Sequence, residues 1–202
     1  MHLNSKGLLS LAIIAAAAIS NASINYNNIV ATVSYDGGAT QNLQVVQDGN
    51  SISFVPPPTM IVSSVGPFSA IVNISYDVTS SKGLNGLDLI FTGFTQGNGM
   101  INYSETVKDS GLNTIASVSN TKSGDGSFVQ EDFLSFANGA ETSYSVSKTF
   151  DLNLGQKELG VSNQDFSAAS VGLVEQNAVP EPATLGAVGV GLFGLLARKR
   201  RK

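Results

Sequence analysis

The sequence of 202 residues contains no cysteine, no tryptophan and only one histidine, His2. Without cysteine no disulfide can form, and zinc sites built from Cys and His ligands are excluded. The Ser-His-Asp and Cys-His arrangements of many hydrolases are excluded as well. Carboxylate chemistry remains, but the adjacent Glu131 and Asp132 would point to opposite faces of a strand and could not flank one bond. We therefore expect that the protein is not an enzyme and needs no cofactor.

Positive charge is scarce between the two ends of the chain. Lys6 and five residues after Ala197 account for six of the eleven lysines and arginines, whereas fourteen of the fifteen acidic residues lie in residues 23–178. That central part has five cations and fourteen acids, a formal charge near −9. No basic patch is available to replace the counterions of a nucleic acid, so no nucleic-acid partner is expected.

Long apolar runs occur only at the two ends. At the N-terminus, Lys6 precedes the apolar stretch Leu8–Ile19, and Ser20-Asn21-Ala22 places small residues at the usual cleavage positions. These features predict a secretory signal peptide, residues 1–22, that is cleaved after Ala22. A membrane anchor is the alternative, but the apolar run is short for one.

The C-terminal segment, residues 179–202, has three parts. It starts with Val179, Pro180, Glu181 and Pro182, where the prolines fix φ and lack an N–H, so that we expect an extended segment unable to pair as a central strand. An uncharged stretch follows that includes Leu185, Leu192, Phe193, Leu195 and Leu196. As a helix this stretch would span roughly 20 Å of a ~30 Å hydrocarbon core. The chain ends with Arg198, Lys199, Arg200, Arg201 and Lys202, which would hold this end in the cytoplasm.

This order of Pro-Glu-Pro, apolar helix and basic cluster resembles the PEP-CTERM sorting domain of Gram-negative bacteria. The resemblance implies that exosortase, a membrane protease-transpeptidase, cleaves near the Pro-Glu-Pro motif. It also implies a transient membrane anchor, a final location at the cell surface or outside the cell, and an association with exopolysaccharide and biofilm. A simple tail anchor is the alternative, and the Leu-Pro-x-Thr-Gly signal of sortase substrates is absent.

The central residues 23–178 show the alternation of a half-buried strand, most clearly over Phe68–Thr79. Asp48-Gly49-Asn50 predicts a hairpin between 43–47 and 51–55. Further strands are predicted at 29–35, 87–94, 100–107, 112–119, 144–154 and 169–174. Phe128–Phe136 is a stretch in which a short helix competes. About nine strands predict one secreted all-β domain, an antiparallel β-sandwich of the jelly-roll or immunoglobulin-like kind.

Candidate binding residues in this domain all have a structural alternative. Calcium could bind acidic turns such as Asp36-Gly37-Gly38, Asp48-Gly49-Asn50 and Gly124-Asp125-Gly126, but these are also ordinary tight-turn sequences. Tyr26, Tyr103 and Tyr144 could stack on sugars, although tyrosines in a sandwich usually fill the core.

Two charged residues interrupt apolar faces. Glu105 falls on the face of Ile101, Tyr103 and Val107, and Lys148 falls on the face of Val146 and Phe150. A buried charge without a partner is costly, so we hypothesise that Glu105 and Lys148 form an ion pair inside the domain. A bulge, or a position near a strand end that reaches solvent, is the alternative.

Together these patterns predict an exported structural or adhesive surface protein. The family resemblance implies an extracellular polysaccharide as its partner. A carbohydrate- or calcium-binding module is the alternative, followed by a carboxylate-dependent glycosidase.

Processing at both ends is the first testable expectation. The mature protein from the native host should lack Met1–Ala22 and the residues that follow the Pro-Glu-Pro region, because both segments are read as signals. Intact-mass measurement checks this. A mature product that keeps Arg198–Lys202 would identify a simple tail anchor instead, and a host without exosortase should retain the uncut form in its membrane fraction.

Overall fold

The structure, a computed structural model, describes residues 22–55, 59–63, 68–155 and 167–180. Residues Ser23–Pro180 form one compact unit. The predicted signal peptide before Ala22, the triplet Pro56–Pro58, the apolar C-terminal stretch and the basic cluster lie outside the described residues. Within the described ranges, no helix is long and apolar enough to cross a membrane.

All regular structure in the described residues is β-strand, and every strand pairing is antiparallel. The described residues contain eleven strands in this order: β1 (Ile24–Tyr35), β2 (Thr40–Asn42), β3 (Gln44–Asp48), β4 (Ser51–Val55), β5 (Thr59–Ser63), β6 (Phe68–Gln96), β7 (Gly99–Asp109), β8 (Thr114–Ser123), β9 (Gly126–Ser135), β10 (Glu141–Leu154) and β11 (Ser167–Pro180).

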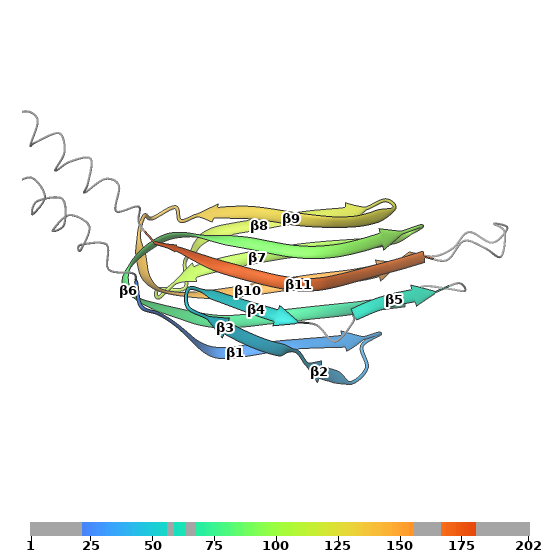
Figure 1. Cartoon of the computed structure of the whole chain (residues 1–202), viewed down its shortest axis with the longest axis horizontal. Helices are drawn as coiled ribbons and strands as arrows, with labels where there is room; N and C mark the ends of the chain where they lie inside the picture. The colour runs from blue at the N-terminus through green and yellow to red at the C-terminus, as the bar shows by residue number, and fades with distance from the viewer. Residues whose placement is uncertain (1–21, 56–58, 64–67, 156–166, 181–202) are drawn as a thin grey trace, which may run out of the picture. The chain divides into compact units, whose positions relative to one another are not determined.

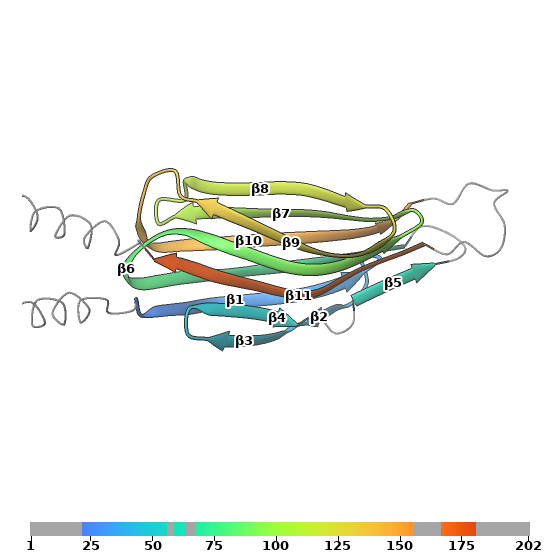
Figure 2. The same cartoon turned by 45° about the horizontal axis from the view of Figure 1, so that its top comes forward.

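The long strand β6 belongs to both layers of the fold. Its first part, residues 68–80, pairs with β1 and β10, whereas residues 84–96 pair with β9 and β11. The chain turns between these parts, at one end of the domain (Figures 1 and 2). The first layer therefore has the order β2-β1-β6-β10-β7-β8, and the second has β3-β4-β11-β6-β9, with β5 also beside β11. The predicted antiparallel β-sandwich is confirmed.

The core lies between these two layers and follows from the alternation in the sequence. In β6, Ala70, Val72, Ile74, Tyr76 and Val78 are buried, and their neighbours in the sequence face outward. Rings from the two layers meet across the core: Phe91 in the second layer contacts Tyr103 and Phe150 in the first, with centroid distances of 4.8 and 5.0 Å. Burial of each large apolar side chain stabilises the fold by about 1.5–3 kcal/mol.

Several predicted elements differ in the structure. The stretch Phe128–Phe136 is mainly strand β9, because it alternates between inward and outward residues and pairs with β6 from Gly86 to Thr95. The helical alternative was wrong. Leu112 has φ 65° and lies in a turn, so the strand predicted from residue 112 begins at Thr114 instead. The hairpin of β3 and β4 around Gly49 is confirmed.

Gly99, at the start of β7, gives a test of the packing. A Cβ on Gly99 would lie 1.8 Å from the carbonyl oxygen of Ala168 in β11. Gly99→Ala should therefore lower the free energy of unfolding by about 1–3 kcal/mol or more, because the backbone must move apart. Gly155→Ala is the matched control, since the nearest atom to its Cβ would be 3.9 Å away. Denaturant unfolding of both variants measures the difference, and equal stabilities would contradict this packing.

Candidate functional site

The C-terminal sorting motif begins inside the folded domain. Val179 pairs with Gly86 and Pro180 with Leu84, with a register shift between the two pairs. The prolines predicted a segment unable to pair as a central strand, and among the described residues Val179 and Pro180 pair on one side, with β6. The domain boundary expected after Ala178 stays a prediction. Pro180 has no N–H to donate to a neighbouring strand, and it fits here because it is the last residue of β11. Glu181 and Pro182 lie outside the described residues.

The start of the domain reaches the same part of β6. Ser23 donates its N–H to Ser81 Oγ at 2.9 Å, and the N–H of Ser81 donates to the carbonyl of Ser23 at 3.0 Å. Ile24 pairs with Ser80, four residues before the partner of Pro180. Both ends of the compact unit therefore lie at the turn of β6, at one end of the sandwich (Figure 1). Cleavage after Ala22 stays a prediction.

The acidic turns proposed for calcium are turns in the structure. Asp36 and Gly37 both have positive φ, and Asp36 Oδ1 accepts the N–H of Ser69 at 2.8 Å. Gly49, Gly124 and other turn glycines also have positive φ, as such turns require. Among the described residues, no group of three or more Asp, Glu, His or Cys is close enough to hold a metal ion.

The three tyrosines considered for sugar stacking are in the core. Tyr26, Tyr103 and Tyr144 are all at least nine-tenths buried, so that stacking alternative was wrong. The Tyr26 hydroxyl donates to the carbonyl of Asn50 at 2.6 Å, and burial raises the pKa of Tyr26 to about 12. The Tyr103 hydroxyl donates to Asp132 Oδ2 at 2.5 Å, whereas the neighbouring Glu131 is exposed. Glu131 and Asp132 thus face opposite sides of β9, as predicted.

The predicted ion pair lies in the middle of the core. Lys148 Nζ is 3.1 Å from Glu105 Oε1, and both residues are only 1% exposed. The two residues are direct partners across β10 and β7, a pairing that runs from Gly99 to Asp109 without a bulge. The hypothesis is confirmed, and the bulge and solvent alternatives were wrong. Burial lowers the pKa of Lys148, and the nearby Glu105 carboxylate opposes that effect.

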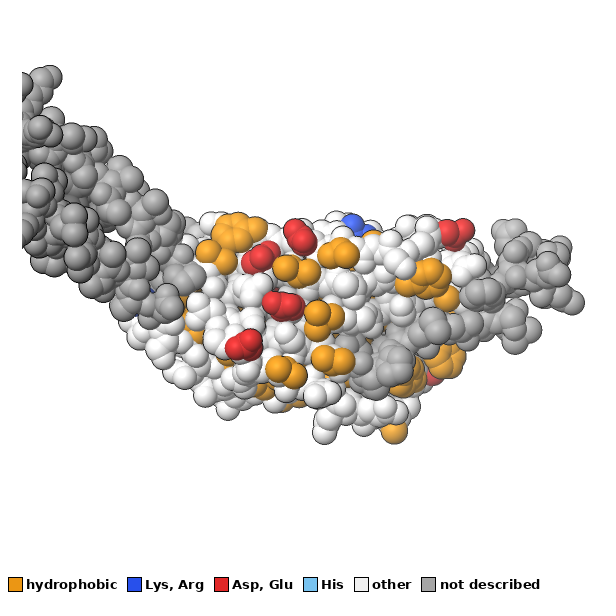
Figure 3. Space-filling view, in the orientation of Figure 1, with side chains coloured by type: hydrophobic (Ala, Val, Ile, Leu, Met, Phe, Trp, Pro, Cys, Tyr) orange, Lys and Arg blue, Asp and Glu red, His pale blue; other side chains and the backbone are white. Residues whose placement is uncertain are grey.

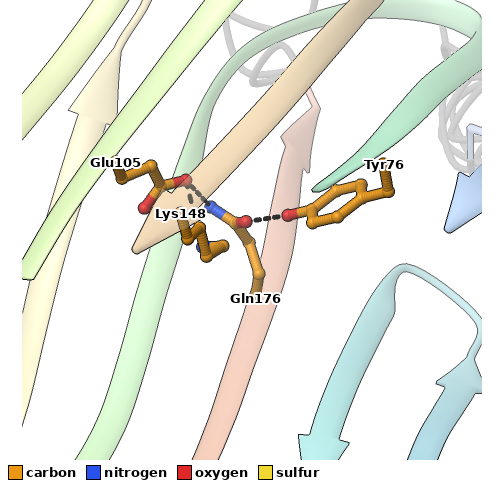
Figure 4. Close-up of polar contacts among 4 residues, drawn as sticks. All are labelled: Tyr76, Glu105, Lys148 and Gln176. Carbon is orange, nitrogen blue, oxygen red and sulfur yellow. Dashed lines mark hydrogen bonds and ion pairs between the residues drawn. The ribbon is translucent and has the colours of Figure 1, made fainter. Parts of the chain in front are cut away.

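Two further residues join the pair and form a buried polar quartet: Tyr76, Glu105, Lys148 and Gln176 (Figure 4). Gln176 Nε2 donates to Glu105 Oε1 at 2.7 Å, and the hydroxyl of Tyr76 donates to Gln176 Oε1. Burial and the charge of Glu105 raise the pKa of Tyr76, so its hydroxyl stays protonated. Gln176 was not selected from the sequence, although Gln176 alternates with outward residues and shares an inward face with Val174 and Ala178.

A polar hollow with a volume of about 600 Å³ lies on the outer face of the first layer. Two rows of paired residues cross this face. Ser145 on β10 pairs with Asp77 and Lys108, and Ser147 on β10 pairs with Ser75 and Thr106. The hollow is lined by residues of β1, β6, β7 and β10 and of the turn after β7: Asn28, Ser75, Tyr76, Asp77, Thr106, Lys108, Leu112, Ser145, Val146 and Ser147. The polar residues of this lining on β6, β7 and β10 were not selected from the sequence, although they occupy the outward positions of the same alternation, whereas Tyr76 and Val146 are buried.

The outer face of the second layer has a different character. Val129 and Phe133 on β9 are 62% and 60% exposed, and the exposed Glu131 lies between them. Figure 3 shows a face of the molecule on which hydrophobic and acidic side chains are interspersed, with little positive charge. The two outer faces therefore offer different contacts, one rich in hydroxyl and amide groups and one acidic and partly apolar.

The sequence comparison assigns the C-terminal segment. Residues 178–202 match the family model described as the PEP-CTERM protein-sorting motif. The chain is thus an all-β sandwich that carries a sorting motif for export and exosortase processing, with a C-terminal membrane anchor before cleavage. Among proteins of curated function, none matches this sequence.

Solved structures share only a distant likeness with the chain. TmCBM61 in complex with beta-1,4-galactotriose is 14% identical over 75% of this chain and 88% of its own, with a TM-score of 0.37. The isomalto-dextranase of Arthrobacter globiformis T6, complexed with panose, is 12% identical over 77% of this chain and 23% of its own, with a TM-score of 0.33. The structure of the infectious bursal disease virus Gx strain is 5% identical over 80% of this chain and 33% of its own, with a TM-score of 0.34. Similarity this low assigns neither a ligand nor an activity.

The buried pair gives a stability prediction. Glu105→Gln or Lys148→Met alone should lower the free energy of unfolding by about 3–5 kcal/mol, because each leaves a buried group without its partner. The double variant should lose less than the sum of the two single losses, since the residues are coupled. Denaturant unfolding of the two single variants and the double variant measures the coupling. The exposed control Glu131→Gln should change the free energy of unfolding by at most about 0.5 kcal/mol. Additive losses would show that the two residues act independently.

Proposed function

We propose that this protein is a surface or matrix component that exosortase releases from its membrane anchor, and that it acts by binding an extracellular polysaccharide rather than by catalysis. The observation that carries the proposal is the sorting motif at residues 178–202, which marks a protein destined for the outside of the cell. The family resemblance associates such proteins with exopolysaccharide and biofilm, and the chain offers a face with suitable chemistry.

The polar hollow is the contact surface that we assign to the polysaccharide. Sugars present hydroxyl groups that both donate and accept hydrogen bonds, and Ser and Thr hydroxyls do the same. Ser147 and Thr106 lie side by side on adjacent strands, next to the row of Asp77, Ser145 and Lys108. Asn28 Nδ2 donates to Asp77 Oδ2 at 2.7 Å, which holds this carboxylate at the edge of the hollow. Regular cross-strand spacing gives a repeating polymer several equivalent contacts.

Charge favours a neutral polysaccharide. Residues 23–178 carry a formal charge near −9, from five cations and fourteen acids. An acidic polymer would be repelled at low ionic strength unless cations intervened. Lys108 is the cation in the hollow, and it shares its row with Asp77. A neutral chain that contacts hydroxyl groups meets no such repulsion.

The position of both domain ends supports a tethered role. Ser23 and Pro180 both lie at the turn of β6, so the chain enters and leaves the sandwich at the same end. The strands run along the length of the domain (Figures 1 and 2). A sandwich held at one end and carrying a polar face along its strands suits a matrix or adhesive component.

Binding to neutral polysaccharides, with and without calcium, tests the proposal. The variant Thr106→Val/Ser147→Val removes two hydroxyls from the hollow and replaces both residues with valine, which favours β-strands. It should weaken binding roughly ten- to thirtyfold, because each lost hydrogen bond contributes about 1 kcal/mol. The control Ser53→Val/Ser127→Val removes two hydroxyls from the second layer's outer positions.

Equal losses in both variants, or no binding to any neutral polysaccharide, would contradict the assignment of the hollow. Binding that requires calcium would favour the metal-dependent module, and release of oligosaccharides would identify an enzyme.

A further inference from the structure

The buried polar quartet contains the parts of a reaction as well as an ion pair. Lys148 supplies a primary amine, Gln176 supplies a carboxamide, and Glu105 Oε1 contacts both nitrogens, at 3.1 and 2.7 Å. On the other side of the amide, the Tyr76 hydroxyl donates to Gln176 Oε1. Figure 4 shows the Gln176 side chain lying between Tyr76 and the Glu105–Lys148 pair.

We propose that Lys148 and Gln176 form an intramolecular isopeptide bond, with Glu105 transferring the proton and Tyr76 polarising the amide carbonyl. This bond would join β10 in the first layer to β11 in the second. The proposal is independent of polysaccharide binding, because the reacting groups of the quartet are buried in the core. Tyr76 also lines the polar hollow, but it is only 2% exposed.

The amine has the environment that a nucleophile needs. Lys148 is 1% exposed, and its cross-strand partner on β6 is the buried Ile74. Burial disfavours the ammonium form and lowers the pKa of Lys148, which makes the neutral, nucleophilic amine more accessible. Within the described residues, Nζ has no hydrogen-bond partner in addition to its contact with Glu105.

The amide is held as an electrophile. Gln176 is completely buried, with Ile52 and Leu89 as its cross-strand partners. Tyr76 donates a hydrogen bond to the oxygen on which negative charge would develop during attack at Cδ. Because water is excluded from this part of the core, both the hydrogen bond and the carboxylate act at low dielectric.

The proposed reaction is balanced without any added reagent. A bond forms between Lys148 Nζ and Gln176 Cδ, the bond between Cδ and Nε2 breaks, and ammonia leaves. Glu105 takes a proton from the amine and passes it to the departing nitrogen, so the carboxyl group returns to its initial state. Nothing is oxidised or reduced.

The bond would give this chain a cross-link that its composition otherwise excludes. The sequence has no cysteine, so no disulfide can tie the two layers together. An amide between Lys148 and Gln176 would close a loop that includes the last residues of β10 and most of β11, and it would withstand reducing agents. Such a cross-link would restrict the separation of the layers under load or heat.

Peptide mapping of the full chain, purified from the fraction in which it accumulates and then denatured, tests the proposal. Trypsin should fail to cleave after Lys148, and mass spectrometry should find a branched peptide. In that peptide the segment containing Lys148 is joined to the segment containing Gln176, and its mass is one ammonia below the sum of the two. Glu105→Gln should abolish the branched peptide, whereas the exposed control Glu131→Gln should retain it.

The peptide map of the chain without substitutions tests for the bond even if a core variant does not fold. Complete cleavage after Lys148, with separate peptides of unaltered mass, overturns the proposal. A branched peptide that instead joins Lys148 to the Glu105 segment with loss of water overturns the assignment of Gln176 as the acyl donor. A branched peptide that persists in Glu105→Gln overturns the role of Glu105.

Discussion

The contact between Glu105 and Lys148 constrains how the whole sandwich packs as it folds, because two charges removed from water must then be paired. The pair is satisfied only when β7 and β10 keep their register, since a slip of one residue would turn one of the two side chains toward solvent. Gln176 extends this requirement to the second layer through its hydrogen bond to Glu105. A network of this kind is weak evidence for added stability, but it specifies one arrangement of strands.

The continuity of β6 is the second constraint on the fold. One strand contributes to both layers, so the turn between residues 80 and 84 fixes how the layers face each other. Gly83 suits this position, because a Cβ there would lie 2.6 Å from the Cβ of Ala140. The inward side chains of the two parts of β6, such as Tyr76 and Leu89, then reach the same core.

The fold was largely predictable from the sequence, because alternation of polar and apolar residues has a direct physical cause in a half-buried strand. The ion pair was predictable for the same reason: Glu105 and Lys148 each interrupt an apolar face, and a charge there needs a partner. Gln176 was harder to select, since burying a neutral amide costs less free energy than burying a charge and does not require a charged partner. Residues 68–79 and 87–94 belong to one strand, β6. The sequence did not indicate this, because Ser80, Lys82 and Gly83 between them are residues typical of a loop. The polar hollow depends on register between strands distant in the sequence, which composition does not reveal.

The boundary between domain and sorting motif follows from strand pairing rather than from composition. Ala178 donates its N–H to the carbonyl of Asn50, and Val179 and Pro180 still pair with β6. The motif that matches residues 178–202 therefore overlaps the last residues of β11. A cut after the paired residues leaves β11 whole, whereas a cut before Val179 would remove strand residues from the turn of β6. Ser23 and Ile24 pair at that same turn, so a cut before Val179 would remove paired residues from the end of the sandwich where the compact unit both starts and ends. The fold thus favours cleavage on the C-terminal side of Pro180.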